Sequence, residues 1–179
     1  HLIRMTGDPV RGVHRLDHGT SGLMIFARSS AAAEAFDGAF RSHAVRRTYL
    51  ALCHGHPAAP ARWDEPLTLR KPDGPPREVS AVTRLLTALP AGPGALLHLA
   101  LDTGRWHQVR LHAALHGHPL LGDRTHGDPT LDRPFRPRRL ALHSHTLEFD
   151  HPITGAQFRF EMPLPRDLVD LLARLRGEC

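Results

Sequence analysis

The sequence predicts an α+β fold, with a mixed and mostly antiparallel sheet flanked by helices. Stretches with strand character outnumber helical ones, and the two kinds do not alternate regularly as they do in parallel α/β folds. With 179 residues and 41% hydrophobic side chains, the chain is long enough to bury a core of its own. We therefore expect a single domain over residues 1–179.

The strands are predicted from apolar runs bounded by Gly and Pro. They are expected at residues 13–16, 22–28, 46–53, 79–89, 95–102, 146–149 and 157–161, with a short extended piece near 63–69. The loop at 90–94 makes the fourth and fifth runs a hairpin, and the turn at 150–155 makes the last two another. The run 46–53 alternates apolar and polar side chains, which is typical of a half-buried strand.

Three stretches have the spacing of helices. Ser29 or Ser30 can cap a helix over residues 31–40. Residues 103–117 place apolar side chains one turn apart and end at Gly117, a typical helix stop. Leucines at helical spacing in residues 165–176 predict a last helix packed on the core.

The charge favours an anionic partner. Lys and Arg number 23 against 18 Asp and Glu, the net charge is +5, and every cation except Lys71 is Arg. The guanidinium group suits phosphates and base edges, so nucleic acid is the expected partner. Residues 124–139 form an irregular basic loop that is either an RNA clamp or a solvated surface.

Cysteine content and hydropathy indicate a soluble protein of a reducing, cytoplasmic compartment. Only Cys53 and Cys179 are present, too few for a disulfide framework or a cysteine-rich zinc site. No apolar run approaches the ~20 residues of a spanning helix, and the chain does not open on a signal peptide.

The first chemical motif is the stretch 14–23, which reads H-R-L-D-H-G-T-S-G-L. It places Asp17 in a turn bounded by Gly19 and Gly22, directly before an apolar run. Glycines permit such a turn to approach a ligand closely, and loops of this kind often hold catalytic side chains. From spacing alone, a purely structural turn is an equally good interpretation.

Two further motifs lie downstream. Residues 104–112 read G-R-W-H-Q-V-R-L-H and continue into G-H-P-L-L-G-D at 117–123, and residues 139–143 read R-L-A-L-H. Together with the stretch 14–23, they resemble the signature motifs of the RluA-type pseudouridine synthases over roughly residues 13–160. The resemblance implies the pseudouridine synthase fold, a mixed sheet with a central cleft across it.

The resemblance also implies an activity and a set of site residues. A uridine in rRNA or tRNA would be turned out of the RNA and isomerised to pseudouridine, with no cofactor and no metal. Asp17 would act at C1′, as a nucleophile or through a glycal intermediate, with Arg110 paired to it. Tyr49, of a K-x-Y segment, would stack on the uracil and help remove the C5 proton, and Leu142 would pack on the base's other side.

Two cations complete the expected site. Arg15 would fill the space left by the turned-out nucleotide or grip the backbone, and Arg105 would hold a phosphate. For both, an ordinary surface cation is the alternative interpretation.

The chain departs from the family pattern in four ways. Arg47 replaces the usual lysine, His126 the usual tyrosine of G-D-x-x-Y-G, and Ser144 the usual alanine. The K-P-x-G segment that usually precedes the aspartate motif has no match, so we expect either a fragment or a shortened member.

Two other functions compete with this one. A catalytically inactive RNA-binding module of the same fold would keep the basic cleft. A metallohydrolase would use the chain's histidine pairs, such as His112 and His116 one helical turn apart, but no H-E-x-x-H motif completes a hydrolytic zinc site.

Overall fold

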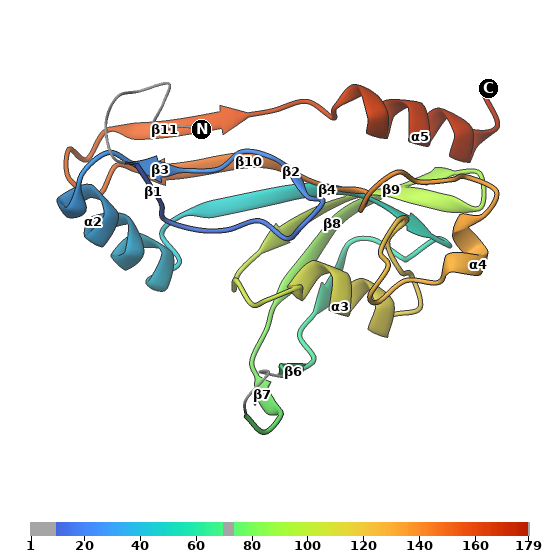
Figure 1. The fold of residues 1–179 in the computed structure, drawn as a ribbon, viewed down its shortest axis with the longest axis horizontal. Helices are drawn as coiled ribbons and strands as arrows, with labels where there is room; N and C mark the ends of the chain where they lie inside the picture. Colours follow the sequence, from blue (N-terminus) through green and yellow to red (C-terminus); the bar gives the residue numbers. More distant parts are fainter. Residues whose placement is uncertain (1–9, 70–73, 179) are drawn as a thin grey trace.

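The computed structural model describes residues 10–69 and 74–178. Its centre is a seven-stranded sheet in the order β11-β10-β4-β9-β8-β5, with β2 paired to β10 (Figure 1). The strands of the described residues are β1 Arg11–Gly12, β2 Ser21–Gly22, β3 Phe26–Ala27, β4 Arg46–His54, β5 Ala61–Trp63, β6 Leu67–Leu69, β7 Arg77–Val79, β8 Thr83–Ala91, β9 Gly94–Leu101, β10 Leu142–Asp150 and β11 Gln157–Glu161. The helices are α2 Ser30–Arg41, α3 Gln108–Leu115, α4 Pro129–Asp132 and α5 Arg166–Arg176.

The predicted fold class is confirmed. Every pairing in the main sheet is antiparallel except that of β2 with β10, so the sheet is mixed and mostly antiparallel. Both predicted hairpins form, from β8 and β9 and from β10 and β11. No helix in the described ranges is long and apolar enough to cross a bilayer.

The central strand β4 is covered on both faces, because α3 and α5 lie on opposite sides of the sheet (Figure 1). Ala51 faces the cluster that includes Val109 and Ala113 of α3. Its neighbour Leu52 faces the cluster that includes Leu168 and other leucines of α5. The prediction of a half-buried strand at 46–53 is therefore wrong for its second half, which is buried on both faces.

Helices α2 and α5 start within one residue of their predicted positions, whereas α3 starts at Gln108, inside the predicted stretch 103–117. Ser29 caps α2 by accepting a hydrogen bond from the backbone N–H of Ala32. The helix buries Phe36 against Phe149 of β10, with the ring centroids 5.3 Å apart. Phe36 and Phe149 belong to a third apolar cluster, which also contains Val13 and Ala27. This cluster packs the amino-terminal segment and α2 against β10.

The amino-terminal strands are shorter than predicted. No strand forms at 13–16, and the strand predicted at 22–28 is interrupted between β2 and β3. The N–H of Val13 still donates to the Ile25 carbonyl, in register with the pairing of β1 and β3. The N–H of Ile25, however, donates to Nε2 of His14 in place of the next ladder bond. The hydrogen bonds of a continuous ladder are thus replaced by bonds within a folded loop, which carries Asp17.

Candidate active site

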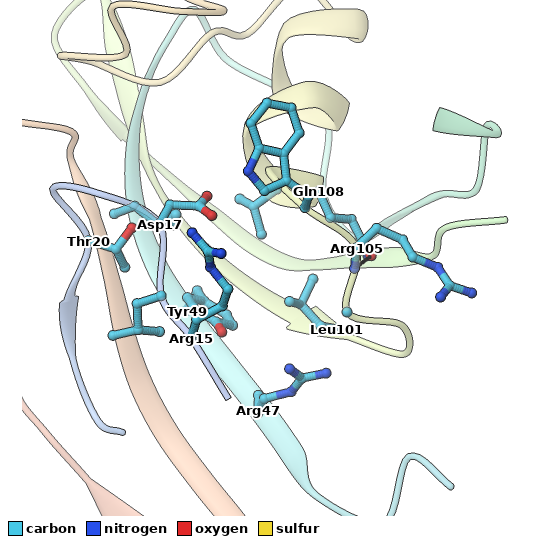
Figure 2. Close-up of a pocket in the computed structure, with 13 residues that line it drawn as sticks. Arg15, Asp17, Thr20, Arg47, Tyr49, Leu101, Arg105 and Gln108 are labelled. Atoms are coloured by element: carbon cyan, nitrogen blue, oxygen red, sulfur yellow. Dashed lines mark hydrogen bonds between the residues drawn. The ribbon is translucent and has the colours of Figure 1, made fainter. Parts of the chain in front are cut away.

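Five of the six predicted site residues line one pocket of about 170 Å³ (Figure 2). Asp17 and Arg15 come from the loop before β2, Tyr49 from β4, Leu142 from β10 and Arg105 from the loop before α3. These segments are far apart in the sequence. The sixth residue, Arg110 of α3, reaches Asp17 from outside this pocket, with its Nη1 3.8 Å from the carboxylate Oδ2.

The Asp17 loop is fastened to β10. The N–H of Thr20 donates to the Asp17 carbonyl at 2.9 Å and closes the turn. Gly22 pairs with Ser144 at φ +110°, where a side chain would collide with the Ser144 carbonyl. Arg139 donates to the Gly19 carbonyl at 2.9 Å. The glycines therefore serve the close approach that the sequence predicted, although the neighbour is backbone of this chain.

Arg110 binds two carboxylates unequally. Its Nε and Nη2 donate to Asp123 at 2.7 and 2.6 Å in a bidentate pair, whereas Asp17 lies 3.8 Å from Nη1. The side chains of Arg110 and Asp123 are 6% and 1% exposed, so this pair is buried. The predicted pairing of Arg110 with Asp17 is present, but Asp123 is the stronger partner.

The charge state of Asp17 is set by opposing effects. Burial raises the pKa of Asp17 above its usual value, and the positive charges of Arg110 and Arg15 oppose this rise without cancelling it. The charge of Arg110 beside Asp17 therefore does not outweigh the burial of the carboxyl group.

Tyr49 and Leu142 form apolar walls of the pocket. They lie on neighbouring strands, where Tyr49 pairs with Ser144 two residues beyond Leu142. Tyr49 is only 6% exposed, and burial raises the pKa of its hydroxyl, so the phenol is protonated at neutral pH. The uncharged phenol ring of Tyr49 beside the apolar Leu142 side chain is suited to stacking on a base.

Arginines surround the pocket, but not all of them point into it. Figure 2 shows the guanidinium of Arg15 extending towards Asp17, while that of Arg105 is turned away. Nε of Arg105 donates to the Ser80 carbonyl at 2.9 Å. Arg47 is held between Gly104 and the Phe40 ring, whose centroid lies 5.3 Å from its guanidinium carbon.

Comparison with known proteins identifies the family. Residues 5–115 match the RNA pseudouridylate synthase family. The chain belongs to this family. The predicted RluA-type family membership is thus confirmed.

Named relatives of this family cover most of the chain. It is 35% identical over 170 residues to ribosomal large subunit pseudouridine synthase D of Zymomonas mobilis, covering 87% of this chain and 53% of the relative. It is 36% identical over 188 residues to the protein of the same name in Vibrio vulnificus, covering 93% and 56%. The chain thus spans about half the length of the curated relatives it matches.

Solved structures of the family confirm the fold. The human RNA pseudouridylate synthase domain containing 4 matches with a TM-score of 0.79 and 25% identity, over 97% of this chain and 80% of that one. The human domain containing 1 protein matches with a TM-score of 0.75 and 27% identity, over 98% and 83%. The chain has the pseudouridine synthase fold that its motifs implied.

Sequence reasoning missed the part of Asp123, although this residue closes the stretch G-H-P-L-L-G-D. Besides binding Arg110, its Oδ1 accepts from the N–H groups of Thr125 and His126 at 3.0 Å. These bonds outweigh burial, which acts in the opposite direction, and lower the pKa of Asp123. The sequence did contain a signal for this role, because Asp123 belongs to the same motif region as Arg110 and has the opposite charge.

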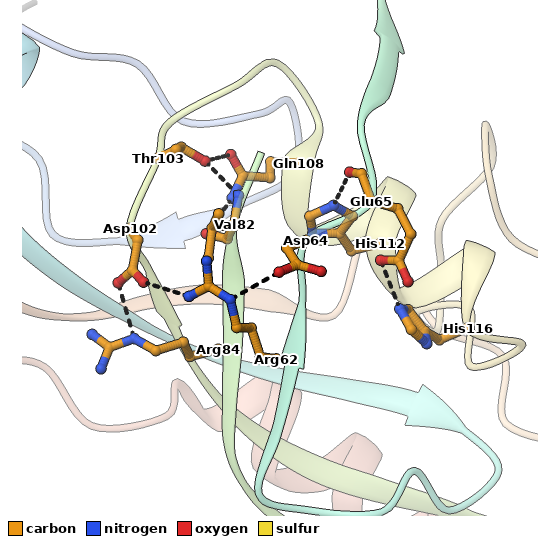
Figure 3. A network of polar contacts seen from close by, with 10 residues as sticks. All are labelled: Arg62, Asp64, Glu65, Val82, Arg84, Asp102, Thr103, Gln108, His112 and His116. Carbon is orange, nitrogen blue, oxygen red and sulfur yellow. Dashed lines mark hydrogen bonds and ion pairs between the residues drawn. The ribbon is translucent and has the colours of Figure 1, made fainter. Parts of the chain in front are cut away.

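Gln108 is a second missed residue, at the first position of α3. Its Oε1 accepts from the Thr103 hydroxyl, and its Nε2 donates to the Val82 carbonyl (Figure 3). Oε1 also accepts from the Arg105 N–H, and Nε2 also donates to the Thr83 hydroxyl. All four hydrogen bonds of the amide are made within 2.7 to 3.0 Å. Gln108 thus links the loop that contains Arg105 to Val82 and Thr83 at the start of β8.

The histidine pairs do not form a metal centre in residues 10–69 and 74–178. No group of three or more His, Cys, Asp or Glu side chains there is arranged to hold an ion. His112 instead bonds to the Glu65 carbonyl, and His116 bonds to the Glu65 carboxylate (Figure 3). His112 also bonds to the Thr83 hydroxyl. His112 and His116 therefore anchor the end of α3 to Glu65, in the segment before β6.

Proposed function

We propose that this chain isomerises uridine to pseudouridine in structured RNA. The observation that carries the proposal is Asp17, a partly buried carboxylate in a pocket with room for one ring. A cavity of ~150 Å³ admits benzene, so about 170 Å³ is enough for a single uracil. Its family membership and the names of its relatives favour ribosomal RNA as the substrate over transfer RNA.

In the proposed reaction, the bond from C1′ to N1 breaks, the uracil turns, and C1′ joins to C5. Asp17 either attacks C1′ and displaces N1, to be released when C5 attacks, or removes the proton from C2′ to give a glycal and later returns it. In both routes C5 loses a proton and N1 ends with one. The carboxylate must be ionised, because only then can it attack or accept a proton.

The other residues hold the nucleotide. The ring of Tyr49 stacks on the detached uracil, and Leu142 packs on the other side. The raised pKa of the Tyr49 hydroxyl argues against its expected role in removing the C5 proton, because a protonated phenol cannot accept one. Arg110 keeps positive charge beside Asp17. Arg15 fills the space left in the RNA or grips its backbone, at a cost of a few kcal/mol for turning out a paired base. Arg105 would leave Ser80 to bind a phosphate.

Tritium release from RNA labelled at C5 of uridine tests this proposal. Wild type is expected to release tritium, and Asp17→Asn to lose activity by roughly 10²- to 10⁴-fold or more. The wild-type rate should increase with pH through the pKa of Asp17, which lies above its usual value. A wild type that binds RNA and releases no tritium would support the inactive RNA-binding module instead.

A further inference from the structure

Trp106 is an exposed aromatic side chain at the same pocket, and the proposed reaction does not use it. It lines the pocket together with Asp17 and Arg15, yet 47% of it is accessible. The other tryptophan, Trp63, is 3% exposed and belongs to the core. A large ring left open beside a proposed RNA site can bind a nucleobase, because every base presents a π-face.

One face of the Trp106 indole is backed by a rigid support. The ring stacks on His107 with the centroids 3.6 Å apart and the planes 18° apart. His107 has a left-handed backbone conformation, with φ +54°, directly before α3. Its Nδ1 lies 2.8 Å from Nε2 of His126, whose N–H donates to the buried Asp123. The indole is thus held in place before any ligand arrives.

The support is electrically neutral at neutral pH. Burial and the charge of Arg110 lower the pKa of His107 to about 4. Trp106 therefore stacks on an uncharged imidazole, and the positive charge of the pocket comes from arginines such as Arg15 and Arg47. An aromatic ring beside a basic groove is the arrangement by which proteins bind single-stranded nucleic acid.

The size of the pocket limits what Trp106 can contact. A volume of about 170 Å³ is close to that of a ~150 Å³ cavity that binds one benzene, so it accommodates one base. If the target uracil lies between Tyr49 and Leu142, the base next to it in the RNA stays outside. The exposed indole at the pocket is the surface available to that second base.

We propose that Trp106 is a stacking platform for the nucleobase directly adjacent to the target uridine. This inference rests on the proposed function, because it assumes that the target base occupies the pocket. It makes Trp106 a substrate-binding residue that orders the strand while the uridine is turned out. His107 and His126 are positioning residues that hold the platform.

Binding measurements with modified RNA test the inference. The probe is a short single-stranded RNA with one uridine flanked by adenosines, and its affinity is read from quenching of tryptophan fluorescence or from anisotropy of a labelled end. Because Trp63 is buried, stacking should quench mainly Trp106. Trp106→Ala is expected to weaken binding about 5- to 150-fold, the range of a single base stacked on an aromatic ring, and Trp106→Phe to weaken it less.

Abasic nucleotides then identify the base involved. Removing the base on one side of the uridine should abolish the difference between wild type and Trp106→Ala. Leu115→Ala is the matched control, since Leu115 is an exposed apolar residue of α3 outside the pocket. It should leave the affinity unchanged for every RNA.

Three results would overturn the inference. The first is equal affinity of wild type and Trp106→Ala for the intact RNA. The second is a difference in affinity that persists both when the preceding base is removed and when the following base is removed. The third is a difference in affinity that only removal of the uracil itself abolishes. Binding requires no turnover, and tritium release is measured separately on the same sequence. A failure of the platform is thereby distinguished from a failure of the proposed reaction.

Discussion

Replacing Asp123 by Asn tests how Arg110 is held beside the proposed nucleophile. The two side chains are 1% and 6% exposed and share two short hydrogen bonds. Asparagine keeps the shape of the side chain and removes its charge. Arg110 would then retain a single carboxylate, that of Asp17 at 3.8 Å, which is too distant for a hydrogen bond.

The expected loss of stability follows from burial. Removing one partner of a buried ion pair costs about 3–5 kcal/mol, because the other charge is left uncompensated. For a domain of this size, 1 kcal/mol lowers Tm by about 2–4 °C, so Asp123→Asn should lower Tm by roughly 6–20 °C. Thermal and urea unfolding followed by circular dichroism measures this. Asp170→Asn, which breaks the exposed pair with Arg166, should cost less than about 1 kcal/mol.

The pH dependence provides the refutation. The folded pKa of Asp123 is below its value of 3.8 in an unfolded chain, so its contribution is fully present above pH 3.8. This stabilisation is lost as the pH falls through the lower pKa of the folded protein. The difference in free energy of unfolding between wild type and Asp123→Asn should therefore disappear in that pH range. If the difference is absent at pH 7, or equally large in acid, the ion pair does not stabilise the site.

Three further predictions concern the scaffold. Gly22→Ala should abolish activity and lower Tm, because the added Cβ would collide with the Ser144 carbonyl. Gly38 lies within α2 with open space around it, so Gly38→Ala should raise the free energy of unfolding in urea by about 0.5–1 kcal/mol. Gln108→Leu should cost about 1–3 kcal/mol for each buried polar group it leaves unpaired, measured in the same way, and should slow tritium release by loosening the Arg105 loop. Burial lowers the folded pKa of His14 to about 4, so the unfolded chain binds more protons below pH 6.5, and acidification from pH 6.5 towards 4 should destabilise wild type more than His14→Gln.

Much of the fold could be predicted from local patterns. Capping by Ser29, the helical leucines of α5 and the hairpin of β10 and β11 depend on neighbouring residues, and the structure confirms them. The turn at Asp17 could be predicted from its glycines. The bond from Ile25 to His14 and the pairing with β10 could not, because they depend on tertiary contacts. The run 22–28 has strand composition, but tertiary hydrogen bonds override that preference.

The site shows the same division. Motif resemblance selected six residues, and the structure brings all six to one region, five at the pocket and Arg110 behind Asp17. It did not rank the partners of Arg110, because a guanidinium can bind either of two acids and only their distances decide. Nor did it select Trp106, because the resemblance implies no role for the residue between Arg105 and His107.

The unequal sharing of Arg110 bears directly on the reactivity proposed for Asp17. A bidentate pair with Arg110 would occupy both oxygens of Asp17 and stabilise the carboxylate against attack or proton transfer. With Asp123 making the short bonds, Asp17 is close enough to feel the positive charge while the arginine leaves its oxygens unbound. Burial also raises its pKa, which makes the ionised form a stronger base. Asp123 thus serves the proposed reaction by occupying the two N–H groups of Arg110 that would otherwise be available to Asp17.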